Sequence, residues 1–160
     1  MKEKICVLKG GKSPEREISL KSGKAIEEAL CKAGYYTLSI DPAEDERLSL
    51  LIREKVDAVF IALHGPGGED GTIQGWLETL NIPYTGSGVL ASALAIDKKS
   101  SRKIWEAEGL KQPDYLVINR KGFSAEDFSF LHLPFIVKPG RSGSTLGVSC
   151  LLYTSPSPRD

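Results

Sequence analysis

The segment HGPGGEDGTIQG, at residues 64–75, brings one imidazole and two carboxylates into a short stretch that is rich in glycine. His64, Glu69 and Asp70 are its ionisable side chains. The glycines permit backbone angles that other residues resist, and they let a ligand approach the main chain closely. The pattern therefore favours a binding site for a small polar ligand. The alternative is a polar surface loop in which Asp70 or Thr72 only caps the helix that follows.

The flanking residues indicate how this loop is positioned. The apolar run at residues 58–63 is rich in β-formers and has the length of a buried strand. After the loop, four apolar residues recur at the spacing of one helix face, i, i+3, i+4 and i+7: Ile73, Trp76, Leu77 and Leu80. Since ligands of open α/β sheets bind outside the carboxyl ends of the strands, we expect the loop to lie at that edge.

A second loop, GGKS at residues 10–13, follows an apolar strand and precedes a helix. It is not a P-loop, because Cys6 stands where the first glycine of GxxxxGK[ST] is needed, and the dinucleotide pattern GxGxxG fails as well. Ser13 suits an N-cap and Pro14 the first helical position, so Glu15 falls in the first turn of the helix. A carboxylate there would suit the ammonium group of a substrate. The alternative is a charge that only complements the helix dipole.

Two lysines, Lys98 and Lys138, each follow a packed apolar segment that limits where the amine can point. Lysine binds phosphates as a point charge. Directly after Lys138, the loop GRSGSTLG at residues 140–147 carries an arginine, three hydroxyls and several glycines. Such a loop can fold backbone amides over a polyphosphate. Taken singly, each lysine is typical of a solvated surface charge. With the glycine-rich loop directly after Lys138, a phosphate site and a surface charge are about equally favoured.

The order of elements predicts an α/β fold. Strands are expected at residues 4–8, 35–40 and 58–63, with helices between them, which favours a parallel, doubly wound sheet. The first helix carries an apolar stripe and ends at Gly34; the stripe comprises Ile18, Ala25, Ile26, Ala29, Leu30 and Ala33. Further along, the pattern predicts a short strand at 81–84, helices at 89–95 and 97–108, strands at 114–118 and 134–137, and a short helix at 124–128.

We expect an N-terminal α/β domain at residues 1–96 that binds substrate. Residues 97–149 would begin a second, α+β domain that is incomplete, because its two or three strands bury little core alone. The segment at 150–160 lacks periodicity and holds two prolines, so we expect an unstructured end, which is also compatible with a non-native tail.

The composition narrows the class of protein. With 21 basic and 21 acidic residues in 160, no overall charge favours nucleic acid or a membrane surface as a partner. No apolar stretch has the length of a membrane span, and the first residues lack a signal-peptide core. The three cysteines are scattered and odd in number, which indicates reduced thiols in the cytoplasm.

Four motifs together resemble D-alanine–D-alanine ligase of the ATP-grasp superfamily: GGKSPEREIS at 10–19, HGPGGEDGTIQG at 64–75, PYTGSGVLASALAIDK at 83–98 and VKPGRSGSTLGVS at 137–149. The resemblance covers about residues 4–149, and the second motif is the most specific. It implies a pre-ATP-grasp domain followed by the start of an ATP-grasp domain. It also implies an ATP-dependent, ADP-forming ligase that joins two D-alanines through a D-alanyl phosphate for peptidoglycan synthesis.

The resemblance implies roles for individual residues. Glu15 would hold the ammonium of the first D-alanine and His64 would line that subsite, which Ile18 and Glu69 would complete. Lys98 and Lys138 would contact ATP phosphates. Gly143 and Ser144 would belong to the same ATP site, with Ser144 also orienting Glu15 as a catalytic residue.

Two departures from the family pattern matter. Ser142 stands where the family usually has an acidic residue. The family's magnesium ligands, its oxyanion-stabilising arginine and its lid tyrosine have no counterpart in these 160 residues, so we expect no metal site and no turnover from this chain alone. A homodimer through the first domain is compatible with the family. Two alternatives stay open: another ATP-grasp carboxylate–amine ligase, and a non-enzymatic α/β module that binds a small anion.

Overall fold

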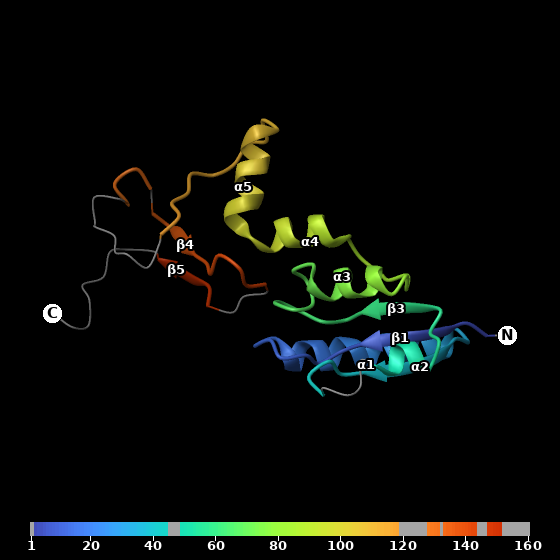
Figure 1. The fold of residues 1–160 in the computed structure, drawn as a ribbon. Helices are drawn as coiled ribbons and strands as arrows, with labels where there is room; N and C mark the ends of the chain where they lie inside the picture. Colours follow the sequence, from blue (N-terminus) through green and yellow to red (C-terminus); the bar gives the residue numbers. More distant parts are fainter. Residues whose placement is uncertain (1, 45–48, 119–127, 132, 144–146, 152–160) are drawn as a thin grey trace. The chain divides into compact units, whose positions relative to one another are not determined.

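The computed structural model describes residues 2–44, 49–118, 128–131, 133–143 and 147–151. It divides the chain into two compact units, Met1–Ile96 and Asp97–Asp160 (Figure 1). The first unit contains β1 (Lys4–Leu8), α1 (Arg16–Lys32), β2 (Tyr36–Ile40), α2 (Leu50–Arg53), β3 (Ala58–Ile61), α3 (Thr72–Thr79) and α4 (Val89–Ile96). The second contains α5 (Lys98–Ala107), β4 (Phe135–Val137) and β5 (Ser149–Leu151). That these units serve substrate and nucleotide binding, respectively, stays a prediction.

The sheet of the first unit is parallel, and the predicted fold class is confirmed. Among the described residues its strand order is β2-β1-β3, and β1 pairs in parallel with both neighbours. Leu8, the last residue of β1, aligns with Ile40 on one side and Ile61 on the other. The carboxyl ends of the three strands therefore meet at one edge, which is called the carboxyl edge below.

The central strand explains where the core lies. Cys6, Val7 and Leu8 are fully buried, as expected for a strand that is covered on both faces. The core cluster adds residues from all the neighbouring elements: Ile40, Leu51, Val56, Val59, Leu63, Ile73 and Leu77. Burial raises the pKa of the Cys6 thiol to about 12, so this cysteine stays protonated and acts as a small apolar side chain.

The first helix differs from its prediction in two ways. It begins at Arg16, so Glu15 is the residue before the helix and not part of its first turn. The residues of α1 that are buried are Ser19 and Gly23, while Ile18 stays 45% exposed, so the apolar stripe does not coincide with the most buried positions of the helix. The reason is close packing: a Cβ on Gly23 would overlap the Lys9 side chain, so this position accommodates only glycine.

Two further predictions need correction. Residues 81–84 do not form a strand. Tyr84 makes an isolated parallel bridge to Val59, and the Val59 backbone N–H donates to the Pro83 carbonyl at 2.8 Å. The predicted strand at 114–118 is not formed, since these described residues belong to no strand. The predicted helix at 124–128 lies almost wholly outside the described residues, as do residues 152–160 of the predicted tail.

In the second unit, α5 begins one residue after the predicted start at residue 97, and Asp97 is its N-cap. The Asp97 side chain accepts a hydrogen bond from the Ser100 backbone N–H at 2.9 Å. β4 and β5 pair antiparallel, with Phe135 opposite Leu151. In the described part of the chain, no helix combines the length and the apolar character that crossing a membrane requires.

Candidate functional site

The loops that follow β1 and β3 are joined at the carboxyl edge by Ser19 of α1. The Ser19 hydroxyl accepts a hydrogen bond from Gly10 N at 2.8 Å and donates to the Ala62 carbonyl at 2.7 Å. Ser19 is fully buried, so both bonds are shielded from water. One hydroxyl thus fixes the relative position of the two glycine-rich loops that the sequence singled out.

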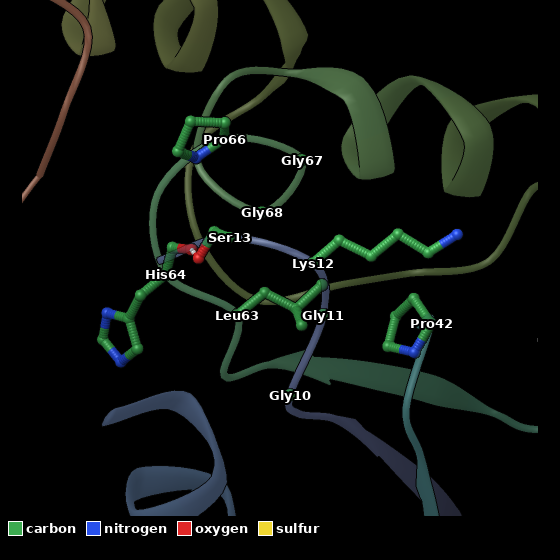
Figure 2. A pocket seen from close by; sticks show the side chains of 10 residues that line it. All are labelled: Gly10, Gly11, Lys12, Ser13, Pro42, Leu63, His64, Pro66, Gly67 and Gly68. Atoms are coloured by element: carbon green, nitrogen blue, oxygen red, sulfur yellow. Dashed lines mark hydrogen bonds between the residues drawn. The ribbon is translucent and has the colours of Figure 1, made fainter. Parts of the chain in front are cut away.

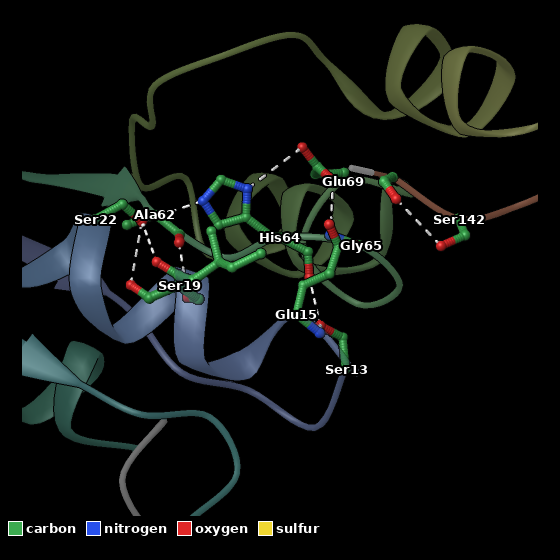
Figure 3. Close-up of polar contacts among 12 residues, drawn as sticks. Ser13, Glu15, Ser19, Ser22, Ala62, His64, Gly65, Glu69 and Ser142 are labelled. Atoms are coloured by element: carbon green, nitrogen blue, oxygen red, sulfur yellow. Dashed lines mark hydrogen bonds and ion pairs between the residues drawn. The ribbon is translucent and has the colours of Figure 1, made fainter. Parts of the chain in front are cut away.

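A second serine ties Glu15 to the histidine loop. The Ser13 hydroxyl donates to the His64 carbonyl at 2.7 Å and accepts from Glu15 N at 3.1 Å (Figure 3). Ser13 was predicted to cap the helix, and its hydroxyl does accept a backbone N–H, but the helix starts three residues later. Ser13 therefore acts as a bridge between the loops.

The Glu15 side chain is the most unusual feature of this edge. It is only 2% exposed, and within the described part of the chain neither carboxylate oxygen has a hydrogen-bond partner. The carboxylate lies against Gly65, where an added Cβ would overlap Glu15 Oε2. A buried carboxylate without partners is costly unless a cation accompanies it. This arrangement is suited to an incoming ammonium group.

His64 has a partner on each ring nitrogen. Its Nε2 lies 3.1 Å from the Ser22 hydroxyl of α1, and its Nδ1 lies 4.0 Å from Glu69 Oε1. The other oxygen of Glu69 accepts the Gly65 backbone N–H at 2.6 Å. The His64 and Glu69 side chains are 31% and 45% exposed, so both are open to solvent in part.

A pocket of about 180 Å³ opens between the two loops, and its lining residues are Gly10, Gly11, Lys12, Ser13, Pro42, Leu63, His64, Pro66, Gly67 and Gly68. Figure 2 shows the imidazole of His64 directed away from Lys12 and Pro42. Glu15 does not line this pocket; its carboxylate lies at Gly65 instead. The structure thus brings Glu15 and His64 to one edge, but it does not place both side chains in this pocket.

Asp70 has a structural role at the start of α3, which is the alternative that the sequence analysis left open for it. Its Oδ2 accepts from Gly67 N at 2.9 Å and its Oδ1 from Thr72 N at 3.1 Å. Burial alone would raise the pKa of Asp70, but these hydrogen bonds outweigh it and hold the pKa below its usual value. Asp70 therefore shapes the loop.

Arg16 and Asp41 clamp the loop after β1 from outside. Their side chains form an ion pair at 2.6 Å, Asp41 Oδ1 accepts from Gly11 N at 2.9 Å, and Arg16 donates to the Gly11 carbonyl at 2.8 Å. Burial would raise the pKa of Asp41, but the hydrogen bonds from Arg16 and from backbone N–H groups lower it overall. The clamp joins the carboxyl ends of β1 and β2.

The second unit brings some of the predicted phosphate-site residues together. Lys98 donates to the Ser142 carbonyl at 2.5 Å, and its backbone N–H donates to the Gly140 carbonyl at 3.0 Å. Arg141 pairs with Asp97 at 2.6 Å, which lowers the pKa of Asp97 to about 2. The glycine-rich loop is thus anchored at the start of α5, next to Lys98.

The remaining predicted residues are less informative. Lys138 is exposed directly after β4, and Gly143 is half-buried in the loop. Ser144 lies outside the described residues. The described residues contain no group of three or more histidine, cysteine or acidic side chains that could hold a metal ion. All the roles assigned to these residues stay predictions.

Ser19, Ser22 and Asp41 were missed by reasoning from the sequence. The two serines follow Glu15 at i+4 and i+7, which is the spacing of one helix face. That polar stripe inside an otherwise amphipathic helix was a usable signal. Asp41 offered less, because Asp-Pro is also common in ordinary turns.

Comparisons with protein-family models and with curated proteins point to the same family. The family model described as D-ala D-ala ligase N-terminus matches residues 42–87. The D-alanine–D-alanine ligase of Nitrosomonas europaea is 49% identical over 91% of this chain and 48% of its own length. That of Pseudomonas entomophila is 49% identical over 91% of this chain and 46% of its own length. The chain spans about half the length of the curated relatives it matches.

Solved structures agree. The D-alanine–D-alanine ligase of Bacillus anthracis matches with a TM-score of 0.78 and 36% identity, over 95% of this chain and 50% of that one. The same enzyme complexed with ATP matches with a TM-score of 0.76 and 35% identity, over 94% and 50% of the two chains. The predicted resemblance to D-alanine–D-alanine ligases is therefore confirmed over most of the chain.

Proposed function

We propose that this chain, which is similar to D-alanine–D-alanine ligases over nine-tenths of its length, supplies the first half of an ATP-dependent ligase that joins two D-alanines for peptidoglycan synthesis. In this proposal the first unit holds the first D-alanine and the second unit helps to hold ATP. The reaction implied is phosphorylation of one D-alanine carboxylate by ATP, followed by attack of the second D-alanine's amine on the acyl phosphate.

The buried Glu15 carboxylate is the observation that carries the proposal. It is 2% exposed and has no hydrogen-bond partner among the described residues. An amino acid substrate offers an ammonium group, which supplies both the missing positive charge and the missing hydrogen-bond donors. Glycine at position 65 is what allows the carboxylate to lie there, because an added Cβ would overlap Glu15 Oε2.

His64, Glu69 and Ile18 complete the proposed subsite. His64 and Glu69 belong to the same loop, and the Ser13 hydroxyl links this loop to the backbone beside Glu15. Both side chains are partly exposed to solvent. Ile18 is in the first turn of α1 and leaves 45% of its surface exposed. It is therefore available to contact the methyl group of D-alanine.

Lys98 and Lys138 are the residues that would hold ATP, together with Gly143 and Ser144. The fit rests on Lys98, whose amine is directed into the glycine-rich loop at the Ser142 carbonyl. ATP supplies the phosphoryl group, and the lysines would neutralise charge on its phosphates. The described residues do not provide a magnesium site.

The cytoplasm is the compartment that fits this proposal. All three cysteines of the chain are free thiols, including the exposed Cys31 and Cys150. Unpaired exposed cysteines are typical of a reducing compartment, which is also where ATP is available.

A titration of the 160-residue protein with D-alanine tests the proposal. Backbone amide shifts at Gly65 and around Glu15 should change with D-alanine and change much less with L-alanine or D-lactate, which lacks the ammonium group. Glu15→Gln should abolish the D-alanine response. An equal response to D-lactate would show that the ammonium is not recognised and would overturn the assignment of Glu15.

A further inference from the structure

The imidazole of His64 is held between a hydroxyl and a carboxylate that belong to different elements. Ser22, in the second turn of α1, lies 3.1 Å from Nε2, and Glu69, in the loop before α3, lies 4.0 Å from Nδ1 (Figure 3). Neither element alone would fix the ring. Because both nitrogens have a partner, the position of the ring proton is set by those two partners.

The carboxylate of Glu69 favours the tautomer that carries its proton on Nδ1. A lone pair on Nδ1 that faced the negative Glu69 at 4.0 Å would be repelled, whereas an N–H there is attracted. Glu69 is itself held in place, because its second oxygen accepts the Gly65 N–H at 2.6 Å. With the proton on Nδ1 of the neutral ring, Nε2 is left as an acceptor.

Ser22 can supply the hydrogen bond that Nε2 then needs. Its hydroxyl also lies 3.0 Å from the Ile18 carbonyl and 3.2 Å from the Ser19 carbonyl, the usual positions for a serine inside a helix. Those carbonyls already belong to the helix ladder, while Nε2 has no other donor in the described structure. We therefore expect the Ser22 hydroxyl to donate its hydrogen bond to His64 Nε2.

We infer that Ser22 is a positioning residue that holds neutral His64 in its Nδ1–H tautomer, with Nε2 accepting from Ser22 and Nδ1–H directed at Glu69. The consequence for substrate rests on the proposed function. With both nitrogens engaged, His64 offers no lone pair to an ammonium group. Recognition of that group then falls to the carboxylates, Glu15 above all, and His64 forms a fixed wall of the subsite.

Nuclear magnetic resonance tests this inference on the 160-residue protein. The chain has two histidines, so His132→Asn leaves His64 as the single imidazole. Long-range proton–nitrogen spectra, recorded above the pH at which the ring takes up a second proton, distinguish the two tautomers. We expect the Nδ1–H pattern. Ser22→Ala should shift the ring toward the Nε2–H form that free imidazole prefers, and Ser22→Thr should restore the parent pattern.

Lys21→Ala, at the exposed neighbouring position of α1, is the control and should leave the pattern unchanged. Alanine favours helix, so loss of fold is not expected in Ser22→Ala. An Nε2–H pattern in the parent, or an unchanged pattern in Ser22→Ala, would overturn the role of Ser22. Adding D-alanine separates the two proposals: an Nδ1–H ring in a protein that ignores D-alanine supports the role of Ser22 and contradicts the proposed function.

Discussion

The Glu15 carboxylate lies against Gly65, in space that a side chain at residue 65 would occupy. Gly65 has a φ of +70°, a left-handed conformation that glycine adopts at little cost. The loop that carries His64 therefore also provides the side-chain-free position against which the buried carboxylate packs. This relationship links the glycine-rich motif to a specific chemical purpose.

Replacing Gly65 by alanine should disrupt this arrangement. The new Cβ would overlap Glu15 Oε2, and the left-handed backbone would be strained. We expect the free energy of unfolding to fall by about 1–3 kcal/mol and D-alanine binding to be lost. Denaturant unfolding measures the first effect. Gly67→Ala is a matched control, because Gly67 also has a positive φ but nothing lies within 4 Å of its added Cβ. Equal losses in both variants would show that only backbone strain matters.

Glu15→Gln should make the ligand-free protein more stable while it abolishes binding. Removal of a buried charge without partners relieves a desolvation cost, so the free energy of unfolding should rise by about 1 kcal/mol. Chemical denaturation at pH 7 without ligand measures the change. A loss of stability would instead indicate that the fold itself supplies a compensating partner to Glu15.

Ser19→Ala should destabilise the protein by about 1–3 kcal/mol, because Gly10 N and the Ala62 carbonyl would both lose a buried partner. Thermal and denaturant unfolding check this value. Thr79→Ala removes a hydroxyl that donates to the Gly75 carbonyl of its own helix on an exposed surface, and should change stability little. Similar effects in the two variants would contradict the bridging role of Ser19.

The ion pair of Arg16 and Asp41 should make stability depend on pH in the acid range. The pKa of Asp41 is lowered in the folded protein, so its contribution to stability is present above the ordinary aspartate pKa of 3.8 and is lost as the pH falls through the lower pKa of the folded state. Asp41→Asn should flatten this part of the stability curve. Unfolding midpoints measured from pH 5 down to pH 2 test this, and parallel curves for the two proteins would show that Asp41 does not contribute.

The sequence predicted the order of elements in the first unit because hydrophobic period and glycine punctuation are local signals. The three parallel strands and the helix start at Asp97 follow from such signals. The buried face of α1 did not follow, because Ser19 and Gly23 are buried for close packing and hydrogen bonding, which apolar periodicity does not detect.

Site residues were predicted mainly from motifs, and the structure adds how they are supported. Glu15 and His64 were expected at one edge, and Ser13 does join their backbones there. Their different surroundings could not be predicted, because the burial of Glu15 and the contact of His64 with Ser22 depend on packing between α1 and a loop more than 40 residues away along the chain.

Calorimetric titration of D-alanine into the parent protein and into Glu15→Gln is the decisive experiment. We expect saturable binding to the parent, at least tenfold weaker binding of L-alanine, and no detectable D-alanine binding to Glu15→Gln. If Glu15→Gln binds D-alanine as tightly as the parent, the buried carboxylate does not hold the substrate ammonium, and the proposed substrate site is wrong.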